Sequence, residues 1–268
     1  MLSLDKTKSI ETLKGFLGNK VGILGWKEDG LTVVLTYENG ELVEAVTRGN
    51  GEVGEVVTPN ARQFKNIPLR IPFKNHLVLR GEAIISYKDF EAINSKIPDI
   101  DNRYKNARNL ASGSVRQLDS RITAQRNVQF IAFDVVEAVG LDDRNSYEMQ
   151  LNLLKSMGFD VVEHVKVNAD NLDKAVKYFQ DKIKQGKILP SDGLVLKYDD
   201  IKYGLSLGNT AKFPRHSIAF KWQDDTVETE IIEIEWSPSR TGLINPVAIF
   251  EPVEIDGTTV SRASVHNV

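Results

Sequence analysis

The sequence predicts an α+β fold in which antiparallel sheets are flanked by helices and followed by a tail of strands. A hairpin is predicted because Asn39-Gly40 stands between the apolar, strand-like runs 31–37 and 42–47. Helices are predicted at 146–157 and 171–185, where apolar residues recur at intervals of three and four. Toward the C-terminus only strand-like patterns remain, which sets the tail apart from the mixed region before it.

The first element is predicted to be a helix at 5–17, with Ser3 or Asp5 as its cap and Gly18-Asn19 at its end. A strand at 21–25 follows it and leads toward the hairpin. The segments predicted after the hairpin are, in order, a short helix near Pro59, a strand at 77–85, helices at 87–96 and 106–116, and strands at 128–136, 159–167, 191–197 and 217–222.

A domain boundary is predicted near 223–227, where the helices stop. It gives a first domain at 1–224 and a β segment at 225–268. The tail strands are expected at 227–236, 246–251 and 258–261. The final ~40 residues are too few for a whole barrel domain, which needs roughly 70 or more, so we expect an incomplete barrel.

Composition excludes several classes of protein. The chain of 268 residues has no cysteine, which excludes disulfides, thiolate catalysis and cysteine-ligated zinc. Its four histidines lack metal-ligand spacing. No apolar run is long enough to cross a membrane, and the N-terminus lacks the pattern of an export signal, so a cytoplasmic location is expected. A net charge of −3 argues against a globally basic nucleic-acid binder, although a local basic surface remains compatible with it.

Charged residues interrupt four otherwise apolar segments. They are Lys27 and Asp29, Arg80 and Glu82, Asp192 and Lys197, and Lys221. Because charges are rarely buried unless they are paired or functional, this pattern indicates a common cleft. Lysines beside carboxylates suit a polyphosphate accompanied by a divalent cation. Neighbouring cations also lower the pKa of a lysine, which favours a neutral amine nucleophile.

Lys27 lies in Trp26-Lys27-Glu28-Asp29-Gly30, between two strand-like runs. A glycine there lets the backbone approach a ligand. An ordinary turn is the alternative, because Asp-Gly is a leading hairpin signal. The stretch alone therefore does not distinguish a nucleophile from a turn.

Several motifs in this order resemble the adenylation domain of bacterial NAD-dependent DNA ligases. They are K-x-D-G at 27–30, T-R-G-x-G-x-x-G-E at 47–55, R-G-E at 80–82, N-x-R-N-x-A-x-G-S-x-R-Q-L-D at 106–119, D-G-x-V-x-K at 192–197 and A-F-K at 219–221. The tail, with R-T-G-x-x-x-P-V-A and S-x-A-x-x-H-N, resembles the start of that family's oligonucleotide-binding (OB-fold) barrel. The resemblance implies an ATP-grasp-like covalent nucleotidyltransferase domain followed by part of an OB-fold.

The resemblance also implies a reaction. Lys27 matches the nucleophile that attacks the α-phosphate of NAD⁺ and forms a lysyl-AMP. The AMP then passes to the 5′-phosphate of nicked double-stranded DNA, and the 3′-hydroxyl displaces it. Asp29 matches the motif aspartate, Glu82 a carboxylate near the ribose and the metal, and Asp192 a second acidic position, so Mg²⁺ is expected at Glu82 and Asp192.

The remaining site residues are assigned by the same resemblance. Lys197 and Lys221 match lysines that contact the α-phosphate, and Arg48 matches an arginine beside the nucleotide. Arg108 and Arg116 match arginines at DNA phosphates and on the nicotinamide side. The other nucleotide contacts expected are Phe133, stacked on adenine, and the backbone at Ser3 and Leu4.

Simpler interpretations of these residues remain open. Glu82 could pair with Arg80, and Asp192 could be a turn residue. Arg108 and Arg116, eight positions apart, could form a solvated helix face. Phe133 could fill the core.

The chain departs from the family pattern near the nucleophile. Gly25 replaces a glutamate that contacts adenine, while Asn50 and Val56 replace two acidic residues. These changes predict altered adenine recognition. They also indicate a divergent member of the family, such as a viral protein that acts in the host cytoplasm.

A second polypeptide is an expected partner. It would supply the nicotinamide-binding, zinc-finger and helix-hairpin-helix parts and the rest of the OB-fold. Without them we expect the chain to hold AMP on Lys27 but to react poorly with NAD⁺ and to seal nicks weakly. The alternatives are an ATP-dependent polynucleotide ligase or capping-type transferase, and a catalytically idle nucleic-acid-binding subunit.

Overall fold

The computed structural model describes residues 3–49, 54–99, 102–140, 145–222, 226–238, 240, 242–255 and 258–265. The chain separates into two compact units, residues 1–222 and 223–268. Asn50, one of the departures named above, lies outside the described residues.

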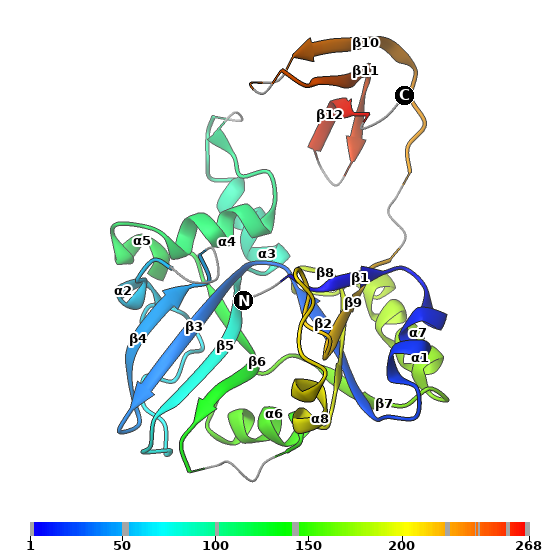
Figure 1. Ribbon diagram of the computed structural model, residues 1–268. Helices are drawn as coiled ribbons and strands as arrows, with labels where there is room; N and C mark the ends of the chain where they lie inside the picture. The colour runs from blue at the N-terminus through cyan, green and yellow to red at the C-terminus, as the bar shows by residue number, and fades with distance from the viewer. Residues whose placement is uncertain are drawn as a thin grey trace. The chain divides into compact units, whose positions relative to one another are not determined.

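A five-stranded sheet in the first unit carries the nucleophile motif. Its strand order is β1-β9-β8-β2-β7 (Figure 1). The strands are β1 (Asp5–Thr7), β9 (Ser217–Phe220), β8 (Ser191–Tyr198), β2 (Gly22–Glu28) and β7 (His164–Val167). Only the β1 and β9 pair is parallel, and the other pairs are antiparallel.

A second sheet of four antiparallel strands has the order β4-β3-β5-β6. The strands are β4 (Glu41–Thr47), β3 (Leu31–Glu38), β5 (Leu77–Ile84) and β6 (Gln129–Ala138). The hairpin predicted between β3 and β4 is confirmed. Asn39 and Gly40 both have positive φ, 53° and 80°, as the tight turns preferred in hairpins require.

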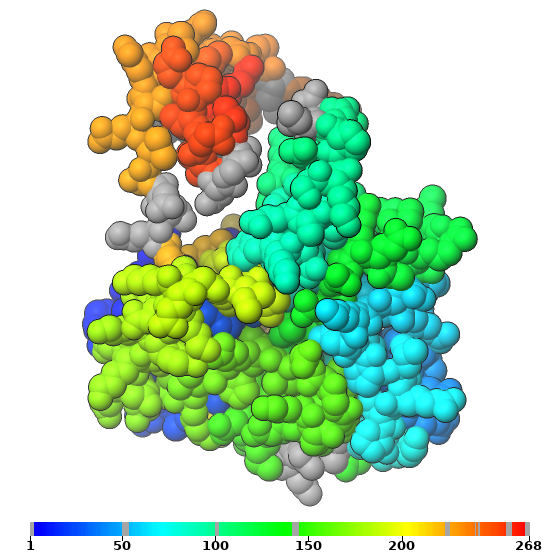
Figure 2. Space-filling model, turned by 180° about the vertical axis from the view of Figure 1, so that it is seen from behind, coloured from blue at the N-terminus to red at the C-terminus, as the bar shows by residue number. Residues whose placement is uncertain are grey.

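Helices pack around these two sheets (Figure 1). They are α1 (Ile10–Leu17), α2 (Thr58–Ala61), α3 (Tyr87–Asn94), α4 (Ala107–Val115), α5 (Ser120–Ala124), α6 (Tyr147–Ser156), α7 (Leu172–Lys184) and α8 (Ile201–Ser206). Leu13 of α1 and Phe179 of α7 join the core of the five-stranded sheet, while Leu110 of α4 joins that of the four-stranded sheet. In the space-filling view the segment containing α3 and α4 forms a ridge on the first unit (Figure 2).

The two cores are held together by elements that contribute to both. Helix α6 places Leu151 in the core of the five-stranded sheet and Leu154 in that of the other. Strand β5 does the same with Ile84 and Leu79. Because packed interiors deform little, these shared elements fix the two sheets relative to each other.

The structure corrects the N-terminal prediction. Residues 5–7 form β1, and the helix begins only at Ile10. Ser9 is the N-cap, and its side chain accepts a hydrogen bond from the Thr12 N–H at 3.3 Å. The helical spacing of Leu13, Phe16 and Leu17 could not show that the residues before them pair with β9, more than 200 positions later. The strand predicted at 159–167 is also shorter, since it begins at His164.

The second unit contains three antiparallel strands in the order β10-β11-β12. They are β10 (Ile231–Pro238), β11 (Ile244–Ile255) and β12 (Thr258–Ser264). Among the described helices of the chain, none is long and apolar enough to span a membrane.

Gly193 in β8 provides a test of this arrangement. It lies opposite Lys27, has φ +153°, and a Cβ there would lie 2.2 Å from the Phe220 carbonyl oxygen. We expect Gly193→Ala to lower the free energy of unfolding by roughly 1–3 kcal/mol, because the β8 and β9 backbones would have to separate.

Gly15→Ala is the matched control, because a Cβ on this α1 glycine meets nothing within 4 Å. Replacing a helical glycine by alanine should stabilise the protein by about 0.5–1 kcal/mol. Denaturant unfolding monitored by circular dichroism measures both changes. Equal effects of the two substitutions would contradict the close approach of β8 and β9.

Candidate active site

Lys27 lies near the end of β2, where the five-stranded sheet passes into β3. Its neighbour Trp26 is buried on the helix side and contacts the Phe179 ring edge-on, with ring centroids 4.7 Å apart. Because successive strand residues point to opposite faces, Lys27 faces away from α7. Its side chain is 24% exposed, so the amine is within reach of a ligand.

Asp192 joins two of the predicted lysines. Its carboxylate oxygens lie 2.6 Å from Lys27 Nζ and 2.9 Å from Lys221 Nζ. Burial acts to raise the pKa of Asp192, but the two lysines outweigh it and lower the pKa. Asp192 is therefore a charged carboxylate between two ammonium groups. It does not act only as a turn residue, the alternative interpretation of its Asp-Gly sequence.

Glu82 of β5 faces the same region from the four-stranded sheet. It accepts hydrogen bonds from the Gly30 N–H at 3.2 Å and the Thr32 hydroxyl at 2.9 Å. Burial raises the pKa of Glu82 to about 7, although these bonds and the charges of Lys27 and Arg108 act to lower it. Glu82 thus gains or loses a proton near neutral pH.

Lys197 lies on β8, on the same face of the sheet as Lys27, within a second charged cluster. Its ammonium is 2.7 Å from Asp134 Oδ1 and lies 4.1 Å from the centroid of the Tyr147 ring. Burial acts to lower the pKa of Lys197, but the Asp134 carboxylate outweighs it, and the pKa is raised. Arg80 also reaches Asp134, at 3.4 Å, so Arg80 bonds to this carboxylate and not to Glu82.

The two predicted arginines of α4 have different partners. Arg108 Nη1 lies 2.5 Å from Asp29 Oδ1, so the helix is tied to the segment that carries the nucleophile. Arg116, at the C-terminal end of α4, lies 2.7 Å from Glu55 Oε2. Both guanidinium groups remain about half exposed, at 55% and 45%, and are accessible to phosphates.

Arg48, Phe133, Ser3 and Leu4, the remaining predicted residues, belong to other segments of the first unit. Arg48 follows β4 and is partly buried, and its N–H donates to the Thr32 carbonyl at 3.1 Å. Phe133 is partly buried and packs against the core of the five-stranded sheet. Ser3 and Leu4 precede β1, which pairs with β9 next to Lys221.

Sequence reasoning missed Asp134, Tyr147 and Thr32, which hold Lys197 and Glu82. Tyr147 OH donates to the Phe133 carbonyl, and burial raises the pKa of Tyr147 to about 12. Asp134 is a charged residue inside an apolar strand, the same signal that identified Glu82, and it could have been found by that criterion. Thr32 and Tyr147 give no such signal, because threonine in a strand and tyrosine in a helix are ordinary.

The described residues contain no cluster of three or more histidine or acidic side chains suited to a metal ion. A metal cage built from protein alone therefore does not fit. Mg²⁺ usually takes one or two carboxylates together with substrate phosphates and water, and Glu82 and Asp192 are carboxylates of the kind that such a sparser donor set uses.

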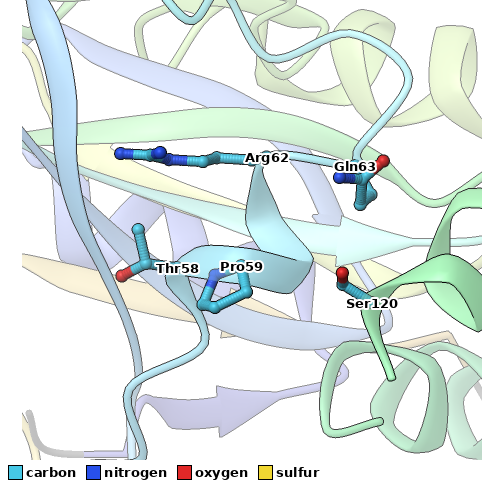
Figure 3. Close-up of a pocket in the computed structure, with 5 residues that line it drawn as sticks. All are labelled: Thr58, Pro59, Arg62, Gln63 and Ser120. Carbon is cyan, nitrogen blue, oxygen red and sulfur yellow. The ribbon is translucent and has the colours of Figure 1, made fainter. Parts of the chain in front are cut away.

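A pocket of about 420 Å³ lies elsewhere on the first unit, between α2 and α5 (Figure 3). It is lined by Thr58, Pro59, Arg62, Gln63 and Ser120. None of the residues predicted to bind a nucleotide belongs to it.

Comparison with known proteins shows which families the chain matches. The family described as the NAD-dependent DNA ligase adenylation domain matches residues 1–225, and that described as the NAD-dependent DNA ligase OB-fold domain matches residues 228–268. A DNA ligase of Lachnoclostridium phytofermentans is 62% identical over 271 residues, and one of Ruminiclostridium cellulolyticum is 59% identical over 268 residues. Each alignment covers 100% of this chain and 41% of the ligase, so the chain spans less than half the length of these curated relatives.

A solved structure named Pmar-Lig_PreS3 has a TM-score of 0.52 at 14% sequence identity. The match covers 98% of this chain and 56% of that one. At this identity it shows a similar fold and no more.

The raised pKa of Glu82 predicts a pH dependence of stability. Between about 4.5, the ordinary value, and about 7 the folded protein holds this proton while the unfolded chain does not. The free energy of unfolding should therefore fall as the pH rises through this window, by at most roughly 1.4 kcal/mol per pH unit, and then level off.

Glu82→Gln keeps the size of the side chain and removes the titration. We expect the variant to gain stability relative to the wild type between pH 5 and pH 8, as measured by urea unfolding at both values. An equal difference at the two pH values would show that Glu82 titrates normally.

Asp134→Asn should leave the Lys197 ammonium without its anion in a site where both side chains are about 80% covered. Removing one partner of a buried pair is costly, so we expect the free energy of unfolding to fall by about 3 kcal/mol.

Asp173→Asn is the control, because it removes an exposed partner of Lys14 at a similar distance, 2.9 Å. Exposed pairs contribute about 0–1 kcal/mol. Denaturant unfolding at pH 7 compares the two variants, and similar losses would contradict a special role for Asp134.

Proposed function

The chain belongs to the family of NAD-dependent DNA ligase adenylation domains, and on that premise we propose that Lys27 takes AMP from NAD⁺ and passes it to nicked DNA. The contact that supports this best is Asp192 held between Lys27 and Lys221, at 2.6 and 2.9 Å. It brings a candidate nucleophile and a phosphate-binding cation to one carboxylate. The proposed nucleotidyltransferase domain is 1–224, with an ATP-grasp-like arrangement of its sheets, and the proposed OB-fold segment is 225–268.

In the first step the Lys27 amine forms a bond to the α-phosphorus of NAD⁺. The bond from that phosphorus to the bridging oxygen breaks, and nicotinamide mononucleotide leaves with the electron pair. Before attack the ammonium must lose a proton to solvent, and Asp192 Oδ1 at 2.6 Å holds the amine in place.

The lysines neutralise the negative charge that develops on the phosphate oxygens. Lys221 lies beside the nucleophile through Asp192, and Lys197 lies on β8 four positions beyond Gly193, the residue opposite Lys27. Four strand residues correspond to roughly 13 Å, so the charged face is long enough for a nucleotide and not only for a phosphate.

The nucleoside is proposed to lie against the remaining predicted residues. Phe133 offers an aromatic face for adenine, while Glu82 and Asp29 can accept hydrogen bonds from the ribose. Arg48 and the backbone of Ser3 and Leu4 complete the proposed contacts. Mg²⁺, placed by Glu82 and Asp192 with the substrate phosphates, would supply additional positive charge at the reacting phosphate.

In the later steps the AMP moves from Lys27 to the 5′-phosphate at a nick, and the 3′-hydroxyl then displaces AMP. Arg108 and Arg116 are proposed to contact the DNA phosphates, because both are half exposed on α4. The proposed location is the cytoplasm, since the relatives are bacterial DNA ligases. The parts of the relatives beyond this span, or a second polypeptide equivalent to them, are proposed partners for full activity.

Covalent adenylation of Lys27 is the decisive test. The chain is incubated with Mg²⁺ and either NAD⁺ or ATP, with and without a polypeptide that carries the remaining parts of a related ligase. With the second polypeptide present, we expect intact-mass spectrometry to show one added AMP from NAD⁺, with little adduct in its absence, and Lys27→Ala to abolish the adduct.

Lys174→Ala is the matched control, since Lys174 is an exposed lysine of α7. It should form the adduct at the wild-type rate. Formation of the adduct with ATP but not with NAD⁺ would show that ATP is the nucleotide donor. The absence of an adduct under every condition would favour a catalytically idle subunit.

A further inference from the structure

A buried lysine that the proposed reaction does not use lies behind the nucleophile. Lys187 Nζ is 2.8 Å from Glu28 Oε2 and 2.8 Å from the Leu189 carbonyl oxygen. Its side chain is 13% exposed and that of Glu28 is 5% exposed. The same ammonium lies 4.5 Å from the centroid of the Trp26 ring. Lys187 therefore contacts both sequence neighbours of Lys27.

These contacts come from the face of β2 opposite the nucleophile. Trp26 and Glu28 are two positions apart and share a face, while Lys27 between them points the other way. Trp26 is also held by its indole N–H, which donates to Glu163 Oε2 at 3.1 Å. The side chains on both sides of the nucleophile are thus fixed from behind.

The pairing of β2 with β8 is irregular at this point. The register between β2 and β8 shifts between Lys27 and Glu28, because Asp192 is an extra residue in β8, and pairing resumes between Glu28 and Ser191. Beyond the shift, the Asp29 N–H donates to the Pro190 carbonyl at 2.9 Å. The segment 187–190 therefore holds Glu28 and Asp29, the two residues after the nucleophile.

The same segment leads directly into β8 and Asp192. A displacement of Lys187 would therefore change the position of Lys27 relative to Asp192, whose atoms are 2.6 Å apart. Stability alone is a weak reason for this pair, because desolvation offsets much of the attraction between buried charges. Burial is in fact the largest effect on both groups, since it lowers the pKa of Lys187 and raises the pKa of Glu28.

We propose that Lys187 is a positioning residue for adenylation, which acts through Glu28 and Trp26 to fix the Lys27 amine against Asp192. The inference rests on the proposed function, but its structural part can be tested without it.

The test replaces both charges, because a single substitution would leave one buried charge unpaired. Glu28→Met/Lys187→Met keeps similar volume, and it should fold with an unfolding midpoint at least as high as that of the wild type. With the second polypeptide present, we expect the single-turnover rate of AMP addition to Lys27 at saturating NAD⁺ to fall about 10- to 100-fold, since misplacement by about 1 Å can have such an effect. The NAD⁺ concentration that gives half the maximal rate should change less than about threefold.

Two further variants separate positioning from a general effect. Glu28→Lys/Lys187→Glu restores the ion pair in reverse and should recover part of the rate. Lys14→Met removes a lysine that pairs with Glu11 and Asp173, neither of which contacts Trp26 or Glu28, and it should keep the wild-type rate. A double-methionine variant that forms the adduct within twofold of the wild-type rate would overturn the proposal.

Amide hydrogen exchange provides a readout that needs no activity. The Asp29 N–H should exchange at least tenfold faster in the double-methionine variant, while the Leu35 N–H in the middle of β3 is unchanged. Unchanged exchange at Asp29 would overturn the positioning role even if no AMP adduct forms. Absence of the adduct in the wild type, with faster Asp29 exchange in the variant, would instead reject only the proposed function.

Discussion

The ion triad of Lys27, Asp192 and Lys221 is the interaction on which the candidate site depends. Each member comes from a different part of the five-stranded sheet: the end of β2, the start of β8 and the residue after β9. One partly buried carboxylate holds two ammonium groups near each other. Without it, the two positive charges would repel each other in a region of reduced solvation. The order β9-β8-β2 in the sheet makes this possible, because it places the acidic strand between the two basic ones.

The rest of the site follows the same principle of matched charges. Lys197 is paired with Asp134 and Arg108 with Asp29, so these cations do not stand alone in the folded protein. A polyphosphate substrate could replace the carboxylate partners with phosphate oxygens. Glu82 differs from these residues, because hydrogen bonds from Gly30 and Thr32 satisfy it and burial raises its pKa.

The fold was predictable wherever a local pattern decided it. The hairpin at Asn39-Gly40 depends on two residues that accept positive φ, and α6 and α7 follow from apolar spacing. Prediction failed at β1, whose three residues have little preference of their own and become a strand only by pairing with β9. The short helices α5 and α8 were missed as well, because five or six residues contain too few turns to establish a period.

By itself the sequence determined which residues are chemically unusual: Lys27, Glu82, Asp192, Lys197 and Lys221 are charges in apolar segments, and their motifs resemble one family. Only the tertiary structure decided their partners. Lys27 meets Asp192 from 165 positions away, Lys197 meets Asp134, and Lys187 meets Glu28 behind the nucleophile. The physical reason is that side-chain partners across a sheet are set by strand order and register, which arise from the packing of the whole chain and leave no mark in the spacing of neighbouring residues.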